Sequence, residues 1–497
     1  MASHKRAFDR VAFEMKRNFC TVVLILFIVC LTCVASVEEN AVKSREKRSP
    51  KPQFPKFIFG QIAKWIPKVI KQGGQVVEKV EQFVSKNPGT VGAAVVGGVG
   101  VATVLGQKRP RPGCQVYIRR LQERQPVFFN IGSPRSLMLP VDGNLTWAQG
   151  ERSWIACPPS EGSRNSIRGI YLVSAEIECK DGYDFEYVHN GAVFDITQVQ
   201  CDNRVTGNVK TDAARVQCPG THKTIGFDVT FPTIGNRFFD LYQICFDEPS
   251  ATAIYTHHTL IGNEIEHKCF STRPDFKSAG FPQGLAVSSA YNQESQLNRL
   301  VALFGADPNP WGSAEVYYNL SYLQRGHLVP DADQLFTTWQ WSTYFYLNVV
   351  GMWEHINNGN WKYLESNVRT LAQNAKKTLE VYTGVYDTLS LCSLWDHCPE
   401  FTLSNGRIPV PKWLWKVVKS PDLNAAIALV VSNNPFVGED PICGLNGASH
   451  GWNSSIVSNI TYGTVSYCRV QDLQTVVGNI PQEAMAPSIL SFVVSTT

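Results

Sequence analysis

The sequence predicts an α+β protein with a central, largely antiparallel sheet and flanking helices, preceded by a small β-rich domain. Residues 114–240 contain short apolar and β-branched runs separated by Gly, Pro, Asn and Asp clusters, a pattern typical of short strands joined by turns. Further β-type runs occupy residues 253–262, 378–386 and 425–432. The segment 357–365 has the spacing of a helix instead.

The residues before that helix are expected to carry a histidine at the end of a strand. The run 314–323, AEVYYNLSYL, predicts a strand because β-branched and aromatic side chains fit a pleated surface. Gly326 follows and relaxes the backbone immediately before His327. A neutral imidazole can accept a proton from water near physiological pH. His327 is therefore a candidate general base.

The helix expected over 357–365 would present an amide and a carboxylate together. Asn357, Trp361 and Glu365 are spaced four residues apart, so a regular helix would place all three on one face. Trp361 is expected to pack in the core. Mg²⁺ prefers oxygen ligands and is usually held by only one or two protein groups. Strand, histidine and helix together could hold one such cation beside a general base.

Several motifs in this region occur together in a known family. They are RGH at 325–327, Asn348 in YLNV, INNGNWKYLE at 356–365, VYTGVYDTL at 381–389, PKWLWKVV at 411–418 and AIALVVSNNP at 426–435. In this order they resemble the DNA/RNA non-specific endonucleases of the ββα-metal type. The resemblance is closest to secreted, arthropod-type double-stranded ribonucleases. It covers about half of the chain, roughly residues 240–470.

The resemblance implies a nuclease domain at 241–497 that hydrolyses double-stranded RNA, DNA or both. It makes His327 the general base and Asn357 the direct ligand of Mg²⁺, for which Mn²⁺ can substitute. Glu365 would hold the ion through a water molecule. Arg325 and Asn348 would be accessory residues that contact phosphate or position the site.

The sequence departs from the family pattern at two places, and some residues have ordinary structural interpretations. Gln324 stands where the family usually has an acid, and Gly351-Met352 where it often has Pro-Gln; both departures bear on substrate preference and rate. Asn348 could instead be a strand-end amide that bonds the main chain, and Arg325 a solvated ion-pair partner. Asp331 and Asp333 are expected to cap or to be solvated rather than to bind metal.

A rival function belongs to a different class. It is a catalytically weak, cationic nucleic-acid-binding or membrane-active protein built on a nuclease scaffold. The intact His327, Asn357 and Glu365 favour the enzyme. The mild net charge of +4 permits a polyanionic partner without requiring one.

The N-terminal residues indicate secretion. A basic stretch, an apolar run and small residues predict a signal peptide or signal anchor over 1–36. Residues 37–48 are expected to be a propeptide that ends in the basic processing site Arg45-Glu-Lys-Arg48.

Residues 49–113 form a cationic amphipathic and Gly-rich segment. Residues 54–71 alternate an apolar stripe with lysines, a pattern typical of a helix on a membrane surface. Residues 89–106 carry no charge. Two interpretations stay open, namely membrane contact through 54–106 and a flexible propeptide or linker.

Cysteines and glycosylation motifs agree with an oxidising compartment. Eleven cysteines follow the signal, enough for up to five disulfides and one unpaired thiol. Zinc is the alternative, but the sequence has no CxxC pair with histidine partners, and Cys392 and Cys398 favour a local disulfide loop. Glycosylation sequons occur at Asn144, Asn319, Asn453 and Asn459.

Overall fold

The computed structural model describes residues 113–492 except 133, 213–217, 305–316, 318–319, 393–396 and 453–455. The chain divides into two units, residues 1–107 and 108–497, and every described residue belongs to the second. The predicted signal, propeptide and amphipathic segment therefore lie outside the described residues, apart from Gly113. Among the helices that are described, none is long and apolar enough to cross a membrane.

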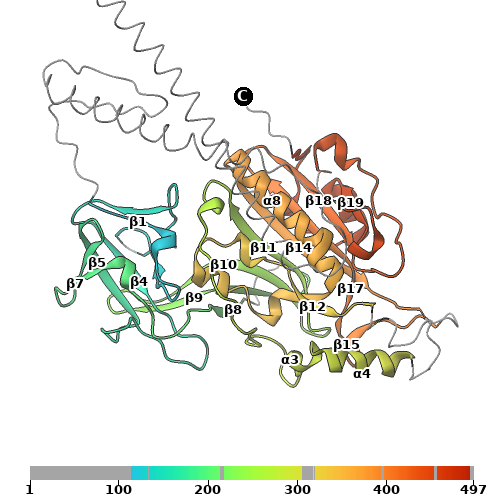
Figure 1. The fold of residues 1–497 in the computed structure, drawn as a ribbon, viewed down its shortest axis with the longest axis horizontal. Coiled ribbons are helices and arrows are strands. Elements are labelled where there is room, and N and C mark those ends of the chain that lie inside the picture. The colour runs from blue at the N-terminus through green and yellow to red at the C-terminus, as the bar shows by residue number, and fades with distance from the viewer. Residues whose placement is uncertain are drawn as a thin grey trace, which may run out of the picture. The chain divides into compact units, whose positions relative to one another are not determined.

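One large, mainly antiparallel sheet organises the described residues (Figure 1). Its nine strands in the described chain run in the order β19-β18-β17-β14-β11-β10-β9-β8, and β20 pairs with β18 in parallel. The strands are β8 (Asn208–Asp212), β9 (Thr221–Phe231), β10 (Gly235–Asp247), β11 (Thr252–Ile261), β14 (Thr378–Thr388), β17 (Pro411–Ser420), β18 (Ala425–Ser432), β19 (Val465–Cys468) and β20 (Ser488–Ile489). The α+β prediction is confirmed.

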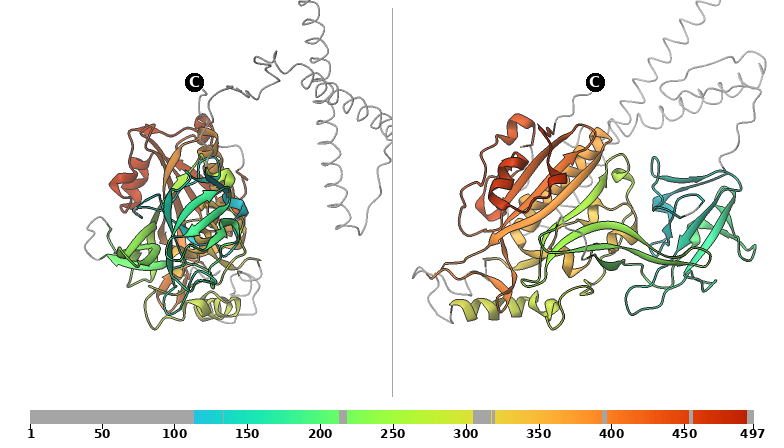
Figure 2. Two further views of the ribbon diagram at one scale, coloured as in Figure 1. Left: turned by 90° about the vertical axis from the view of Figure 1, so that its left-hand side faces the viewer. Right: turned by 180° about the vertical axis from the view of Figure 1, so that it is seen from behind.

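The two faces of this sheet are covered by different helices. Leu364, Val368 and Leu371 of α8 (Lys362–Ala375) pack in one apolar cluster, together with Ile427 and Leu429 of β18. A second cluster contains Val470, Leu473 and Val477 of α9 (Val470–Val477), together with Ala426, Ala428 and Val430 of β18. Alternate residues of β18 thus serve opposite faces, as strand geometry requires. Figures 1 and 2 show α8 and α9 on opposite sides of the sheet.

The β-rich region before the nuclease motifs has its own smaller sheet. Among the described residues it contains β2 (Val127–Phe128), β4 (Arg152–Ala156), β5 (Ser174–Asp181), β6 (Asp184–Tyr187) and β7 (Val193–Asp195), with β1 (Cys114–Tyr117) and β3 (Asn144–Trp147) paired beside it. Strands β8, β9 and β10 continue into the large sheet. The domain boundary predicted at residues 240 and 241 therefore falls within β10.

The remaining described elements are short or lie beside the large sheet. The helices are α3 (Val287–Ala290), α4 (Gln293–Phe304), α6 (Thr337–Trp341) and α7 (Glu354–Ile356), and the strands are β12 (Leu323–His327), β13 (Val349–Trp353), β15 (Thr402–Ser404) and β16 (Arg407–Pro409). Single 3-10 turns occur at η1 (Ile118–Arg120), η2 (Ile196–Gln198), η3 (Ile265–His267), η4 (Asp331–Asp333), η5 (Tyr346–Asn348), η7 (Gly447–His450), η8 (Ile460–Tyr462) and η9 (Gln482–Ala484).

The cysteines pair as the sequence predicts. In the described residues there are five disulfides, which join Cys114 to Cys179, Cys157 to Cys201, Cys218 to Cys245, Cys392 to Cys398 and Cys443 to Cys468. Cys269 is the one free cysteine in this part of the chain, and it is buried. The local loop at Cys392 and Cys398 is confirmed.

The strand predictions are confirmed on the large sheet and fail beside it. Residues 253–262, 378–386 and 425–432 correspond to β11, β14 and β18. The strand predicted over 314–323 is wrong, because pairing with β13 begins only at Leu323 and both Tyr317 and Leu320 are helical. Aromatic and β-branched content favours a strand only where a partner strand is present to pair with it.

Candidate active site

The candidate site is built on the hairpin of β12 and β13 and the helical segment after it. The strands pair antiparallel, with Arg325 opposite Gly351 and His327 opposite Val349. Gly326 must lack a side chain here, because an added Cβ would lie 2.2 Å from the sulfur of buried Met352. The methionine that departs from the family pattern is therefore packed directly under the RGH motif.

His327 ends β12 with its imidazole enclosed by aromatic rings. Its ring centroid lies 5.2 Å from that of Phe276 and 4.9 Å from that of Tyr344. The buried Nε2 has no hydrogen-bond partner among the described residues. Burial lowers the pKa of His327 to about 4, although the charge of Asp331 opposes this shift and that of Arg273 adds to it. The imidazole is therefore neutral at physiological pH and can accept a proton.

Arg325 shares the aromatic surroundings of His327. Its guanidinium lies 5.5 to 5.7 Å from the ring centroids of Phe276, Tyr291 and Tyr346, and its Nε donates to the Tyr346 hydroxyl at 3.1 Å. Nη2 donates to the Ser288 carbonyl at 3.4 Å. No described carboxylate pairs with Arg325, so the simple ion-pair interpretation does not describe it.

Asn348 is buried and bonds the main chain. Its amide nitrogen donates to the Val329 and Thr343 carbonyls at 3.0 and 2.9 Å, and its amide oxygen accepts from the Val329 N–H at 2.9 Å. These bonds hold the loop that leaves His327. The side chain uses both amide hydrogens in this way, which suits a positioning residue.

The helix expected over 357–365 is broken. Residues Asn357–Trp361 form a π-type segment in which Gly359 has non-helical angles, φ −97° and ψ −123°. A Cβ on Gly359 would lie 2.7 Å from a ring carbon of Tyr462, so glycine permits this close approach. Buried Asn360 then anchors the break, since its amide donates to the Val457 and Gly463 carbonyls at 3.0 and 2.8 Å. The prediction of one regular helix is wrong at this point.

Asn357 lies before the break and is attached to β12. Its amide nitrogen donates to Gln324 Oε1 at 2.7 Å. Its amide oxygen accepts no hydrogen bond from a described residue. Asn357 therefore offers an uncommitted neutral oxygen beside the RGH hairpin.

Glu365 lies after the break, in the first turn of α8, and is half-buried. Burial raises the pKa of its carboxyl to about 7, and the charges of Lys416 and Arg369 oppose that rise. Lys416 of β17 is buried as well, with Nζ 2.6 Å from the Thr383 hydroxyl and 5.0 Å from the ring centroid of Trp361. Burial lowers the pKa of Lys416. The interior location expected for Trp361 is confirmed.

A buried ion network lies beside Glu365. Asp333 accepts from His258 Nε2 at 2.9 Å and from Arg369 Nη1 at 2.8 Å. Burial alone would raise the pKa of Asp333, but the hydrogen bond from His258 and the charge of Arg369 hold it well below its usual range. Asp333 is thus committed to His258 and Arg369 in the interior, so the expectation that it would cap or be solvated is wrong. On β11 the adjacent His257 pairs with Glu380 while His258 pairs with Asp333, so the two imidazoles point to opposite faces of the sheet.

Sequence comparison assigns the chain to a family. Residues 222–464 match the DNA/RNA non-specific endonuclease family. A salivary endonuclease of Lutzomyia longipalpis is 30% identical over 299 residues, which cover 59% of this chain and 69% of that protein. The chain belongs to the DNA/RNA non-specific endonuclease family. It is therefore a hydrolytic nuclease, and the predicted resemblance is confirmed.

Two further similarities are weaker. A salivary endonuclease of Culex quinquefasciatus is 27% identical over 337 residues, covering 67% of this chain and 78% of that protein. A crystal structure of the EndoG/EndoGI complex covers 46% of this chain and 85% of that chain, at 14% identity and a TM-score of 0.26. That last similarity is too low to support a conclusion about this endonuclease.

The family consists of metal-dependent nucleases, and the residues present fit a single hard cation. Asn357 offers a free amide oxygen and Glu365 a carboxylate without a hydrogen-bond donor from the described residues. No group of three or more His, Cys, Asp or Glu in the described chain is arranged to hold a metal. A site with one direct protein ligand is suited to Mg²⁺, which keeps most of its waters.

Two residues beside the candidate active site have no signal of their own in the sequence. Arg273 is exposed on the segment that brings Phe276 against His327, and its charge acts on the imidazole. Lys416 is buried under Trp361 and acts on Glu365. Residues 411–418 are marked in the sequence only as part of the resemblance. Both residues are far from His327 in the sequence, so no helix or strand spacing relates them to it.

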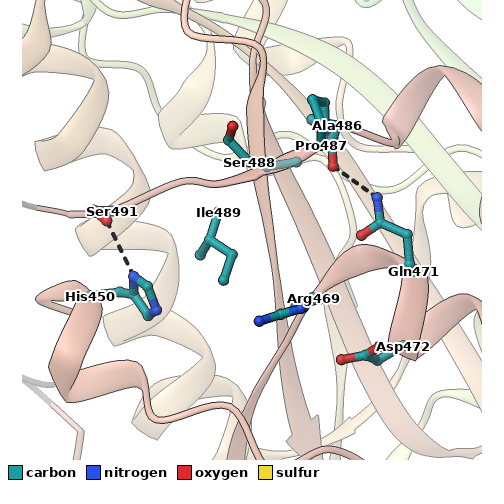
Figure 3. Close-up of a pocket in the computed structure, with 10 residues that line it drawn as sticks. His450, Arg469, Gln471, Asp472, Ala486, Pro487, Ser488, Ile489 and Ser491 are labelled. Carbon is teal, nitrogen blue, oxygen red and sulfur yellow. Dashed lines mark hydrogen bonds between the residues drawn. The ribbon is translucent and has the colours of Figure 1, made fainter.

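A pocket of about 570 Å³ lies where β20 pairs with β18, beside α9 (Figure 3). It includes Ala426, whose side chain belongs to the α9 cluster. Its other lining residues are His450, Arg469, Gln471, Asp472, Ala486, Pro487, Ser488, Ile489 and Ser491. None of the residues that surround His327, Asn357 or Glu365 lines it. The pocket is therefore separate from the candidate active site.

Proposed function

We propose that this protein is a secreted, Mg²⁺-dependent endonuclease that hydrolyses the phosphodiester bonds of double-stranded RNA, DNA or both. The observation that carries the proposal is a neutral imidazole with an unpaired, buried Nε2 at the end of β12, followed after β13 by an asparagine with a free amide oxygen. Secretion is supported by five disulfides and by the salivary names of two relatives. The hairpin and helix supply the order strand, strand, helix of the predicted ββα unit.

Each residue has a defined task in this proposal. The neutral His327 imidazole accepts a proton from the attacking water, a contribution typically worth about 10²–10⁴-fold in rate. The guanidinium groups of Arg325 and Arg273 bind the phosphate oxygens, while Asn348 keeps the loop after His327 in place. Asn357 would hold the cation directly, and Glu365 would act on it through a water molecule. When bound, Mg²⁺ supplies charge stabilisation at the scissile phosphate and the leaving oxygen. Contacts to the backbone alone carry no sequence information, which suits a non-specific nuclease.

The test compares His327→Ala with His189→Ala, an exposed histidine of the β-rich region. Purified full-length variants are incubated with long double-stranded RNA and with plasmid DNA, in Mg²⁺ and then in EDTA. We expect His327→Ala to lower kcat by at least about 100-fold, and EDTA to abolish cleavage by the wild type. His189→Ala should stay within about twofold because it is remote from the site. Cleavage by His327→Ala at the wild-type rate would refute the base assignment.

Secretion has a separate test. The basic site at 45–48 predicts that secreted protein begins at or beyond Ser49. N-terminal sequencing of protein collected from the medium measures this directly. Protein that stays in cells with Met1 or Val37 at its N-terminus would contradict secretion and processing.

A further inference from the structure

The two ends of an asparagine ligand are chemically different. The amide oxygen can bind a cation, whereas the NH₂ group presents two donors and repels it. An asparagine that binds metal must therefore be held with its oxygen outward. Free rotation about the last side-chain bond would let an inverted amide compete with the binding-competent one.

Side chains from three elements form a continuous line of hydrogen bonds to Asn357. Glu354 Oε1 of α7 accepts from Asn358 Nδ2 at 2.9 Å. The same nitrogen donates to Gln324 Oε1 of β12 at 3.3 Å. Gln324 Oε1 also accepts from Asn357 Nδ2 at 2.7 Å.

The Glu354 carboxylate determines which group is the donor and which the acceptor in each of these hydrogen bonds. An ionised carboxylate can only accept, so the nitrogen of Asn358 must face Glu354. The second hydrogen of that nitrogen points to Gln324, which therefore turns its oxygen toward the two asparagines. Asn357 can then approach Gln324 only with its nitrogen, and its oxygen faces away. The chain of bonds thus selects one of two amide orientations.

We infer that Gln324, Asn358 and Glu354 are positioning residues that fix the amide of Asn357 with its oxygen toward the cation. The inference rests on the proposed role of Asn357 as the metal ligand. It also gives a reason for glutamine at a position where the family usually has an acid. Glutamine keeps an accepting oxygen toward Asn357 without adding a negative charge.

Metal binding tests this without any nucleic acid. Mn²⁺ is titrated into the full-length protein and followed calorimetrically and by electron paramagnetic resonance. Gln324→Met keeps the side-chain length but removes the acceptor, and we expect it to weaken Mn²⁺ binding by about 10–100-fold. Gln324→Glu restores an accepting oxygen and should bind Mn²⁺ at least as tightly as wild type. Gln373→Met makes the same change at an exposed position of α8 and serves as the control. We expect it to leave the Mn²⁺ affinity unchanged.

A double-mutant cycle separates orientation from general packing. Both oxygens of an aspartate can bind a cation, so Asn357→Asp needs no oriented amide. We expect Gln324→Met to lose its effect on Mn²⁺ affinity in the Asn357→Asp background. An equal loss of affinity in both backgrounds would show that Gln324 merely supports the fold and would overturn the inference. No loss in either background would overturn it too.

Asn357→Ala in the same titration distinguishes the ligand role of Asn357 from the positioning role of Gln324. Loss of binding in Asn357→Ala but not in Gln324→Met would refute the positioning role and leave the metal ligand in place. Wild-type binding by Asn357→Ala would refute the ligand assignment and the positioning role together. Melting temperatures of all variants are measured in parallel, so that an unfolded variant is recognised by its melting curve and replaced by Gln324→Leu.

Discussion

The two faces of the large sheet use the same strands for different purposes. On β17, Trp415 and Val417 point to the α9 side and pack in an apolar cluster. Lys416 lies between them and points to the α8 side, toward Trp361 and Glu365. Burying a lysine costs free energy unless it is compensated, and here Thr383, Trp361 and Glu365 compensate it. The face that carries buried charge is the face that carries the candidate active site, as perturbed ionisable groups often indicate.

The largest difference between the faces should appear when the cation site is altered. We expect Asn357→Ala to be nearly inactive at every Mg²⁺ concentration, because only water can replace the lost inner oxygen. Glu365→Gln should keep partial activity, about 10–100-fold below wild type, which rises with added Mg²⁺ or Mn²⁺. Cleavage rates over a Mg²⁺ titration measure both. A rescued Asn357→Ala and a dead Glu365→Gln would reverse the two roles.

Lys416 provides a smaller and more specific test. Lys416→Met removes the cation that favours ionised Glu365, so the pKa of that carboxyl should rise further. We expect kcat/KM to fall about fivefold at pH 7 and to recover at higher pH, since raising a pKa of about 7 by one unit lowers the ionised fraction at pH 7 from about one half to about one tenth. Lys419→Met is the matched control on the same strand, where Nζ donates only to the Glu483 carbonyl. A loss of kcat/KM that is equal at all pH values would contradict this role.

The large sheet could be predicted from the sequence because its strands obey simple patterns. β18 is apolar except for its last residue, Ser432, as expected when both faces of a strand are buried. The order of RGH, Asn348 and the asparagine-rich segment also placed the candidate site on one hairpin and one helix. These features depend on residues that are close in the chain.

The parts that could not be predicted depend on contacts between distant residues. The break at Gly359 follows from the approach of Tyr462 and from the bonds of Asn360 to Val457 and Gly463. The charged surroundings of Glu365 come from β17, and Arg273 reaches His327 from a loop. Helix spacing alone therefore predicted one regular face where the chain makes a π-type turn.

The stability of the folded protein should also depend on pH, because Glu365 lies on the charged face of the sheet. The folded pKa of Glu365 is about 7, above its usual value of 4.5, so the protonated carboxyl favours the folded state. This stabilisation is complete below about pH 4.5 and is lost as pH rises through about 7. In EDTA, Glu365→Gln should therefore melt about 2–4 °C above wild type at pH 8 and close to wild type at pH 5. Thermal unfolding at both pH values measures the difference, and an equal shift at both would contradict it.

The smallest effect is expected on the α9 side. Arg469 lines the pocket of Figure 3 and is exposed, and its side chain makes no hydrogen bond or ion pair with another described residue. Arg469→Ala should keep cleavage within about twofold and change the free energy of unfolding by less than about 0.5 kcal/mol, as surface changes usually do. Cleavage assays and urea unfolding measure the two quantities. If Arg469→Ala lowered cleavage as much as Lys416→Met, charge on the α9 side would matter to the reaction. The two sides of the sheet, to which alternate side chains of β17 point, could then no longer be divided into an active and a structural face.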